Sequence, residues 1–413
     1  MREMKDSGVA WIGEIPEEWE ISLINTLYTV RNTKVSDVDY QPLSVTMKGI
    51  VPQLSTAAKT NAHDDRKLVK KGDFAINSRS DRRGSCGISD YDGSVSLINT
   101  VLSPRNEMNP IYYSWLFHSS EFADEFYRWG HGIVDDLWTT RWQEMRSISI
   151  PVPPLSIQHQ IAAYLDQKCT QIDALIANQQ KQIEKLKAYK QSLITETVTK
   201  GLNPDVPMKD SGVEWIGEIP EDWEIIKYGK ICKVKSNLVH PSEYLDYIQV
   251  APDNIEKGSG KLLPCLTVKE NGIVSDNHLF FKGQLLYSKI RPILNKVTIA
   301  PFDGLCSADI YPIETNQDYR YMMYFMLSNL FLVQVKMFTE NRVKMPKINQ
   351  EELAQITSSI PPIEEQQAIV SYLDQKCTQI DNLISIKQRK IEKLQQYKKS
   401  LIYEYVTGKK EVK

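Results

Sequence analysis

Cysteine is scarce in this chain, and long hydrophobic runs are missing. The 413 residues include 6 cysteines. They form no C-x-x-C pair and no Cys/His cluster at metal-ligand spacing, which favours reduced thiols over a disulfide framework or a structural zinc site. No stretch approaches the roughly 18 consecutive apolar residues of a membrane-spanning helix. The segment Met1–Asp6 has no apolar signal core, so we expect a cytoplasmic protein without a membrane partner.

An excess of one charge and recognisable catalytic motifs are also missing. The 50 Lys and Arg residues against 52 Asp and Glu residues give a formal net charge of -2, so any DNA binding must come from local patches or from a partner. There is no phosphate-binding P-loop, no G-x-S-x-G elbow and no H-E-x-x-H pair. The 6 histidines are scattered. We therefore predict neither a catalytic residue nor a metal site in this chain.

An internal duplication organises the sequence. Residues 4–20 read MKDSGVAWIGEIPEEWE and residues 208–224 read MKDSGVEWIGEIPEDWE, while YLDQKCTQID occurs at 164–173 and again at 372–381. The segments between these repeats have nearly equal lengths and barely matching sequences, which predicts one scaffold carrying two different recognition surfaces. The alternative is a duplication whose surface loops drifted without consequence.

Each copy ends in a long segment with the apolar spacing of a coiled-coil seam, in alternating steps of four and three residues. Pro pairs precede these segments, and Gly201 or Gly408 follows them, which marks their boundaries. At four positions of this spacing the seam residue is polar instead of apolar: Gln179, Lys190, Lys387 and Lys398. The seam residues are Leu165, Cys169, Ile172, Ile176, Ile183, Leu186 and Leu193 in the first copy, and Leu373, Cys377, Ile380, Ile384, Ile391, Leu394 and Leu401 in the second.

A seam along about 40 residues, or about 60 Å of helix, has to be covered. Three arrangements could cover it: an antiparallel helix pair within the chain, a dimer, or an ordinary pair of core helices. We favour the antiparallel pair, because the linker Thr199–Pro207 leads directly into the second copy. That arrangement would put the two variable domains at opposite ends of the helices.

Basic side chains follow a predicted turn and strand in both variable segments. In the first, Leu68–Asn77 leads into the loop Ser78–Gly84; in the second, Leu279–Tyr287 leads into Ser288–Lys296. A second basic region lies just before each Pro pair. Such loops suit phosphate contacts and base reading by arginine, although solvated surface charge is an equally good interpretation of the pattern alone. The candidate DNA-binding residues are Arg79, Arg82, Arg83, Arg141, Lys289, Arg291, Lys296, Arg342, Lys344 and Lys347.

Aromatic residues are dense in the first variable segment. They could supply stacking surfaces, but the helical spacing between Tyr112 and Trp129 favours a core role. The sequence Asn109-Pro110-Ile111-Tyr112 superficially resembles an amino-methyltransferase loop. An Asn N-cap with Pro at the first helical position explains it better.

Taken in order, these segments resemble a known family. Two copies of K-D-S-G-V-x-W-I-G-E-I-P-E-x-W-E, two variable regions, and the motifs PPLSIQHQIAAYLD and PPIEEQQAIVSYLD before long helices are similar to the specificity subunit of Type I restriction-modification systems. The resemblance covers nearly the whole chain. It implies an α+β fold with two similar mixed α/β target recognition domains, separated by two long helices in an antiparallel coiled coil with pseudo-twofold symmetry.

The resemblance also implies a function and partners. Each variable region would read one half of a bipartite site on double-stranded DNA, the helices would set the spacing between half-sites, and the chain would direct two methyltransferase subunits and the restriction subunits to that site. S-adenosylmethionine, ATP and Mg would be bound by those partners, with none in this chain. A non-DNA adaptor that presents two protein-binding domains is the alternative.

The expected domain boundaries follow from the repeats. They are 1–155 for the first repeat and recognition domain, 156–200 for the first long helix, 201–360 for the second repeat and recognition domain, and 361–413 for the second long helix and tail.

Overall fold

The chain folds as two compact units, each of which holds one end of each long helix. The computed structural model describes residues 2–54, 63–79, 82–132, 138–342 and 344–412. Unit 1 comprises Met1–Gln179 and Arg389–Lys413, and unit 2 comprises Gln180–Gln388. The units therefore group the ends of the helices with the recognition domains.

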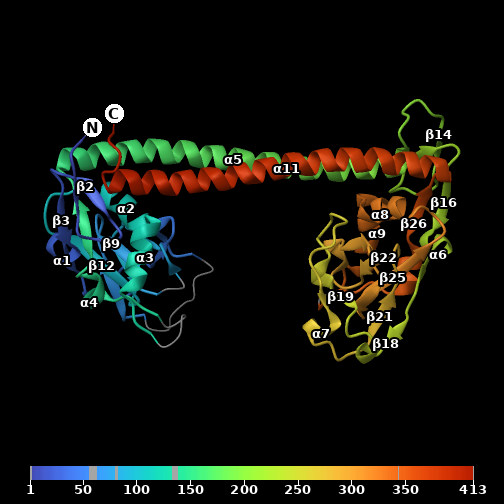
Figure 1. Cartoon of the computed structure of the whole chain (residues 1–413), viewed down its shortest axis with the longest axis horizontal. Coiled ribbons are helices and arrows are strands. Elements are labelled where there is room, and N and C mark those ends of the chain that lie inside the picture. Colours follow the sequence, from blue (N-terminus) through green and yellow to red (C-terminus); the bar gives the residue numbers. More distant parts are fainter. Residues whose placement is uncertain (1, 55–62, 80–81, 133–137, 343, 413) are drawn as a thin grey trace. The chain divides into compact units, whose positions relative to one another are not determined.

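Unit 1 is built from short antiparallel strands and small helices (Figure 1). One sheet has the order β10 (Cys86–Ile88), β9 (Phe74–Asn77), β12 (Asn99–Pro104) and β4 (Tyr28–Val30), and another has the order β11 (Gly93–Ser96), β8 (Arg66–Val69) and β5 (Lys34–Val35). The remaining strands pair as β1 (Met4–Asp6) with β2 (Glu14–Pro16), β3 (Glu20–Leu23) with β13 (Ser149–Val152), and β6 (Leu43–Thr46) with β7 (Gly49–Pro52). The helices are α1 (Ile24–Leu27), α2 (Pro110–His118), α3 (Ser120–Arg128) and α4 (Trp142–Met145).

Unit 2 repeats this plan. Its four-stranded sheet has the order β17 (Cys232–Val234), β25 (Ile310–Thr315), β22 (Leu285–Ser288) and β23 (Val297–Ile299), and its five-stranded sheet has the order β18 (Leu238–Val239), β21 (Asn277–Phe280), β24 (Gly304–Ser307), β19 (Ile248–Val250) and β20 (Leu266–Thr267). The other strand pairs are β14 (Met208–Asp210) with β15 (Glu218–Pro220), and β16 (Glu224–Lys227) with β26 (Thr357–Ile360). The helices are α6 (Tyr228–Ile231), α7 (Val268–Asn271), α8 (Tyr319–Leu327), α9 (Asn329–Thr339) and α10 (Gln350–Gln355), with 3-10 turns η3 (Pro241–Glu243), η4 (Pro252–Asn254) and η5 (Pro292–Leu294).

The two units share one scaffold despite their different sequences. The sheet order β10-β9-β12-β4 corresponds strand by strand to β23-β22-β25-β17, and β11-β8-β5 corresponds to β24-β21-β18. Helices α2 and α3 correspond to α8 and α9 in chain order. The predicted α+β class with an internal duplication is confirmed.

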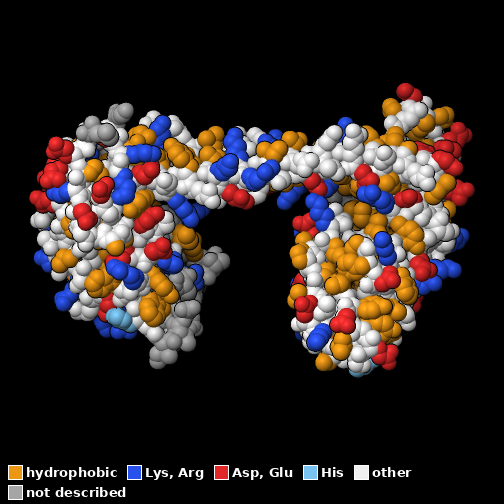
Figure 2. Space-filling model, in the orientation of Figure 1, with side chains coloured by type: hydrophobic (Ala, Val, Ile, Leu, Met, Phe, Trp, Pro, Cys, Tyr) orange, Lys and Arg blue, Asp and Glu red, His pale blue; other side chains and the backbone are white. Residues whose placement is uncertain are grey.

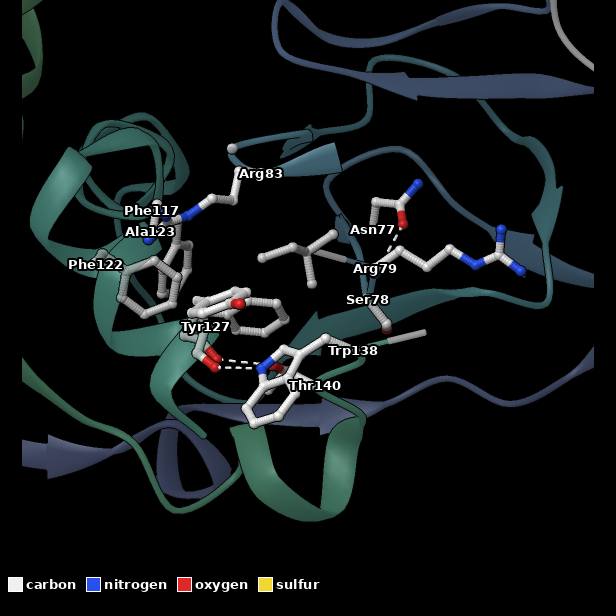
Figure 3. Close-up of a pocket in the computed structure, with 13 residues that line it drawn as sticks. Asn77, Ser78, Arg79, Arg83, Phe117, Phe122, Ala123, Tyr127, Trp138 and Thr140 are labelled. Carbon is white, nitrogen blue, oxygen red and sulfur yellow. Dashed lines mark hydrogen bonds between the residues drawn. The ribbon is translucent and has the colours of Figure 1, made fainter. Parts of the chain in front are cut away.

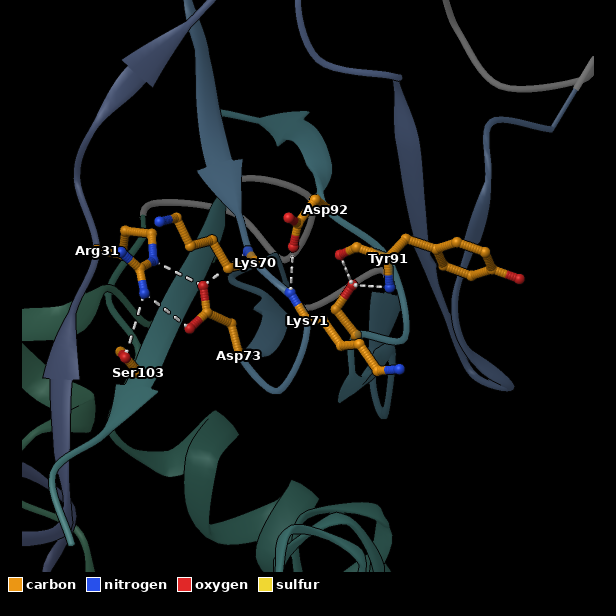
Figure 4. A network of polar contacts seen from close by, with 8 residues as sticks. Arg31, Lys70, Lys71, Asp73, Tyr91, Asp92 and Ser103 are labelled. Atoms are coloured by element: carbon orange, nitrogen blue, oxygen red, sulfur yellow. Dashed lines mark hydrogen bonds and ion pairs between the residues drawn. The ribbon is translucent and has the colours of Figure 1, made fainter.

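The turn before the central strand is held in the same way in both units. In unit 1 the Asp92 carboxylate accepts a hydrogen bond from the backbone N–H of Lys71 at 2.7 Å (Figure 4), and Asp303 does the same for Lys282 at 2.7 Å in unit 2. Unit 1 adds a nearly buried ion pair, in which the Arg31 Nε lies 2.6 Å from Asp73. This pairing raises the pKa of Arg31. A carboxylate thus fixes the turn that leads into β9 or β22, and each basic loop follows at the other end of that strand.

Aromatic residues of the first variable segment form the core of unit 1. Asn109 caps α2 through its side chain, with Pro110 in the first turn, as the sequence indicates. Tyr112, Tyr113, Phe117 and Phe122 are buried. The preference for a core role over exposed stacking therefore holds for the helices α2 and α3.

The long helices α5 (Leu155–Lys200) and α11 (Ile363–Val406) pack antiparallel within each unit. In unit 1 the Lys398 ammonium lies 2.7 Å from Asp173, and the rings of Tyr164 and Tyr405 are 4.5 Å apart. In unit 2 the Lys190 ammonium lies 2.8 Å from Asp381. In both units, later residues of one helix face earlier residues of the other.

The seam residues lie inside these helix pairs. Every seam residue is buried or half-buried. Of the polar positions within the seam, Gln179 is buried, Lys190 and Lys398 pair with carboxylates of the facing helix, and Lys387 donates to Gln182 at 2.5 Å. Polar groups with a partner on the facing helix favour one register of packing.

The core of each recognition domain also contacts the C-terminal end of the long helix that belongs to the other copy. The Tyr112 hydroxyl donates to the carbonyl of Val406 at 2.8 Å in unit 1, and the Tyr321 hydroxyl lies 3.3 Å from the carbonyl of Val198 in unit 2. The end of α11 thus completes unit 1, and the end of α5 completes unit 2.

Among the described residues, no single helix is both long and apolar enough to cross a membrane. The bent pair α8 and α9, at 61°, meets the length and composition criteria together. Most residues of α8 are buried in the core of unit 2.

Candidate nucleic-acid interface

The two basic regions of the first variable segment meet in one groove. Arg79 forms an antiparallel bridge with Thr139, and the Thr140 N–H donates to the carbonyl of Ser78 at 2.9 Å. These contacts bring Arg79, just after β9, beside Arg141, just before α4. Both line a groove of about 610 Å³. Ser80 and Asp81, within the predicted loop, lie outside the described residues.

The groove combines cations with hydrogen-bonding and aromatic groups. Besides the two arginines, its lining includes Lys67, Trp142 and Gln143. The Lys67 ammonium donates to the carbonyl of Asn99 at 2.7 Å, and burial lowers the pKa of this lysine. Within the part of the chain that the structure describes, no acidic side chain pairs with Arg79 or Arg141. The groove is therefore suited to phosphate and base-edge contacts.

Arg83 and Arg82 lie differently from Arg79. The Arg83 guanidinium pairs with Asp124 and stacks 4.8 Å from the centre of the Tyr127 ring. A neighbouring pocket is lined by the aromatic residues Phe117, Phe122, Tyr127 and Trp138, among others. Figure 3 shows Arg83 on the Tyr127 side of this pocket, whereas the Arg79 side chain extends away from it. Arg82 sits in the turn between them, where its carbonyl accepts from the Ser85 N–H at 3.0 Å. Arg83 thus links this loop to α3.

A stacked aromatic pair supports the segment that leads into Arg141. The Tyr127 and Trp138 rings lie 5.6 Å apart with an interplanar angle of 29°, and Trp138 Nε1 donates to the carbonyl of Tyr127 at 2.9 Å. The Thr140 hydroxyl donates to the carbonyl of Phe126 at 2.7 Å. These contacts tie the second basic segment to α3, which positions Arg141.

The two basic segments of unit 2 meet in the same way. Ile290 and Lys347 form an antiparallel bridge, the Arg291 N–H donates to the carbonyl of Pro346 at 2.8 Å, and the Ile348 N–H donates to the carbonyl of Lys289 at 3.0 Å. We call residues 288–296 together with 342 and 344–348 the unit 2 loop pair. Val343, in the second of these predicted segments, lies outside the described residues.

Several cations of the unit 2 loop pair have partners within the protein. The Lys296 ammonium, 14% exposed, lies 3.1 Å from Asp253 and donates to the carbonyl of Pro252 at 2.7 Å. Lys347 lies 3.0 Å from Asp309, and Arg342 pairs with Glu352. The Lys289 ammonium lies 5.2 Å from the centre of the Tyr311 ring. The side chains of these four residues stabilise the unit 2 loop pair through contacts within the protein.

Arg291 and Lys344 differ from those four. Both are exposed, and no carboxylate of the described residues pairs with either side chain. Among the described cations of the unit 2 loop pair, these two are therefore exposed and unpaired with a carboxylate, which leaves them available to a phosphate backbone.

Sequence reasoning identified the basic segments but missed part of the groove. Lys67 on β8 and Asn32 reach it through the tertiary fold. No local pattern marks these two residues, because they come from separate parts of the chain. Gln143 lies within the second basic region, beside Trp142, but was not among the candidate DNA-binding residues.

The described residues contain no cluster of three or more His, Cys, Asp or Glu side chains able to hold a metal ion. Their cysteines are free. Burial raises the pKa of Cys86 and raises that of the seam residue Cys169 to about 11. These two thiols are therefore protonated at neutral pH and are poor nucleophiles.

Comparisons with known proteins agree with this architecture. A Type I restriction enzyme EcoDI specificity subunit from Escherichia coli is 33% identical over 255 residues, which is 58% of this chain and 57% of that protein. A putative type I restriction enzyme MjaX specificity subunit from Methanocaldococcus jannaschii is 26% identical over 436 residues, covering 97% of this chain and 96% of that protein.

A solved structure shares the fold. It comes from work on complex assembly and conformational transition of the type I R-M system, and it aligns with a TM-score of 0.72 at 12% identity over 95% of this chain and 98% of that one. A family model for the Type I restriction modification DNA specificity domain matches residues 16–185 and 220–396. The resemblance seen in the sequence is confirmed, and the chain belongs to the Type I restriction modification DNA specificity domain family.

Proposed function

We propose that this chain is a non-catalytic DNA specificity subunit that reads a bipartite target through its two recognition domains. The observation that carries the proposal is the pair of equivalent basic junctions, Arg79 with Thr139 and Ile290 with Lys347. They lie at matching places on one scaffold, and their sequences differ. Two such surfaces would read two different half-sites.

The arrangement also accounts for the near-neutral net charge. Binding energy for DNA comes largely from phosphate contacts, and the chain carries a formal net charge of -2. Methyltransferase subunits would supply further contacts around the duplex, and restriction subunits would join them in the nuclease. S-adenosylmethionine, ATP and Mg would belong to these partners.

The experiment is methylated-base mapping by single-molecule sequencing. DNA would come from cells that express this chain with its cognate methyltransferase subunit, and the control cells would lack this chain. The proposal expects a two-part methylated motif that depends on both proteins. A complex that forms without producing any motif would contradict DNA reading and favour an adaptor that binds proteins.

A variant of each junction assigns the half-sites. Arg79→Ala should relax the sequence requirement in one half of the motif, and Arg291→Ala in the other half. If both variants relax the same half, the assignment of one half-site to each domain is wrong.

A further inference from the structure

The unit 2 loop pair carries strained backbone where its two segments meet. In the described part of the chain, the non-glycine residues with positive φ are Arg291 (44°), Asn295 (47°) and Met345 (43°). All three belong to this loop pair. Left-handed backbone at such residues is uncommon and persists when the surrounding structure holds it, and such strain clusters at functional sites.

Backbone hydrogen bonds hold these residues in the left-handed conformation. Asn295 is buried, its N–H donates to the carbonyl of Pro292 at 2.9 Å, and its carbonyl accepts from the Gly258 N–H at 3.0 Å. The Arg291 N–H to Pro346 carbonyl bond fixes the second segment beside the first. These backbone bonds join the two segments within the unit itself, and contacts of this kind favour a preorganised binding surface.

Large apolar side chains are exposed at this junction. Ile293 is 53% exposed and Met345 is 55% exposed. Each is within two residues of a junction bond; the exposed cation Arg291 is two residues before Ile293, and the exposed cation Lys344 directly precedes Met345. Figure 2 shows hydrophobic side chains interspersed with charged ones on the visible face of this unit.

The combination of cations and exposed apolar groups matches one feature of duplex DNA. Cations attract the phosphate backbone irrespective of sequence. The apolar group that the major groove offers is the C5-methyl group of thymine. A loop with Arg and Lys around Ile and Met can therefore hold the backbone and bury that methyl group at once.

We propose that Met345 and Ile293 determine specificity in the second recognition domain by contacting a thymine methyl group in its half-site. This inference rests on the proposed function and names the base feature that unit 2 reads. Unit 1 differs in that its junction opens on a groove lined by Arg79, Arg141 and Gln143, whose side chains are of the types that can hydrogen-bond to base edges.

The test replaces thymine by deoxyuridine, which removes only the methyl group. Duplexes carrying the mapped motif would contain this replacement at each thymine of both half-sites in turn. Binding would be measured for the full chain assembled with its methyltransferase subunit. At one or two positions of a single half-site we expect about fourfold weaker binding, the change for about one buried methyl-sized group.

Variants then connect the effect to the side chains. Met345→Ala and Ile293→Ala should bind the thymine and deoxyuridine duplexes equally at those positions, whereas Met345→Leu should retain the preference. Met345→Gly relieves the strained φ and should also lose the preference, which separates the side chain from the backbone. Val274→Ala is the matched control, because Val274 is 83% exposed elsewhere in unit 2.

Defined outcomes overturn the inference. Binding within twofold for every deoxyuridine duplex, a half-site without any thymine, or an unchanged preference in both alanine variants would each do so while leaving the mapped motif intact. Weaker assembly with the methyltransferase subunit in these variants, at unchanged base preference, would assign the apolar residues to a protein interface instead. Absence of any motif would contradict the proposed function itself.

Discussion

The two recognition domains have the same sheet order and the same junction of loops, yet they use their cations differently. In unit 1, Arg79 and Arg141 line an open groove. In unit 2, Lys296, Arg342 and Lys347 pair with carboxylates of the unit itself. A count of basic residues therefore overstates what unit 2 offers to DNA. A basic segment in a sequence therefore contains two kinds of charge: cations that pair with carboxylates of the protein and support its loops, and cations that remain available to a ligand.

The nearly identical hairpins β1–β2 of unit 1 and β14–β15 of unit 2 are covered to different extents. Trp11 packs against Phe122 at 5.9 Å, and its carbonyl accepts from the Tyr403 hydroxyl at 3.0 Å. The Lys409 ammonium donates to the carbonyl of Ile12 at 2.6 Å. In unit 2 the equivalent Trp215 is 47% exposed. The helix end differs there, because Thr195 and Gly201 take the places of Tyr403 and Lys409 in the repeat.

The largest expected effect concerns the available arginines. The double variant Arg79→Ala/Arg141→Ala should weaken target binding by about 2 to 6 kcal/mol, since each base-reading arginine contributes about 1 to 3 kcal/mol. Fluorescence anisotropy with the mapped duplex and the assembled complex measures the change.

The matched comparison is Lys296→Ala/Lys347→Ala in unit 2, which removes paired cations. This variant should weaken DNA binding less than the unit 1 variant does, and it should lower the thermal stability more. Equal binding losses in the two double variants would show that internal pairing does not separate the two classes of cation.

The next largest effect is expected at the turns that precede β9 in unit 1 and β22 in unit 2. Asp73→Ala should lower the free energy of unfolding by about 3 kcal/mol, because it leaves the charge of Arg31 without its nearly buried partner. At the equivalent place in unit 2, Gln284 accepts from the Phe281 N–H at 2.9 Å. Gln284→Ala should cost about 1 kcal/mol.

Urea unfolding followed by circular dichroism, with calorimetry to resolve the two units, measures both changes. A loss for Gln284→Ala as large as that for Asp73→Ala would refute the role assigned to the ion pair. Asp90→Ala, at an exposed carboxylate near the same turn, is a control for removing one negative charge.

A smaller effect tests the crossed helix ends. Tyr112→Phe and Tyr321→Phe each remove a buried hydroxyl that contacts the end of the other copy's helix. Each should lower the free energy of unfolding by about 1 kcal/mol, in the calorimetric transition of its own unit. A change confined to one of the two variants would break the equivalence of the units.

The smallest effect concerns the hairpins. Lys409→Ala should make Trp11 more accessible to acrylamide without changing Trp215, because only the unit 1 hairpin uses this lysine. The measurement requires single variants in which Trp11 or Trp215 is replaced by Phe, so that the difference in quenching reports each indole. Increased quenching of Trp215 instead would contradict the assignment.

Much of the fold was predictable because it depends on patterns that a sequence displays directly. The duplication, the long helices and their seam follow from repeats and from apolar spacing that a helix converts into one face. The core position of Phe117 and Phe122 follows from the same spacing. The candidate site was predictable only as basic segments, since Lys67 and Asn32 join the groove through strand pairing at long sequence separation.

Local and periodic properties of the sequence specify the two copies, the ends of the long helices and the loops that carry cations. The folded structure specifies which cations have internal partners and which of the two nearly identical hairpins is covered. It also shows that each domain is completed by the other copy's helix. These outcomes depend on contacts between residues far apart in the chain, such as Tyr112 with Val406. Their energies come from burial and pairing, which exist only once the chain has folded.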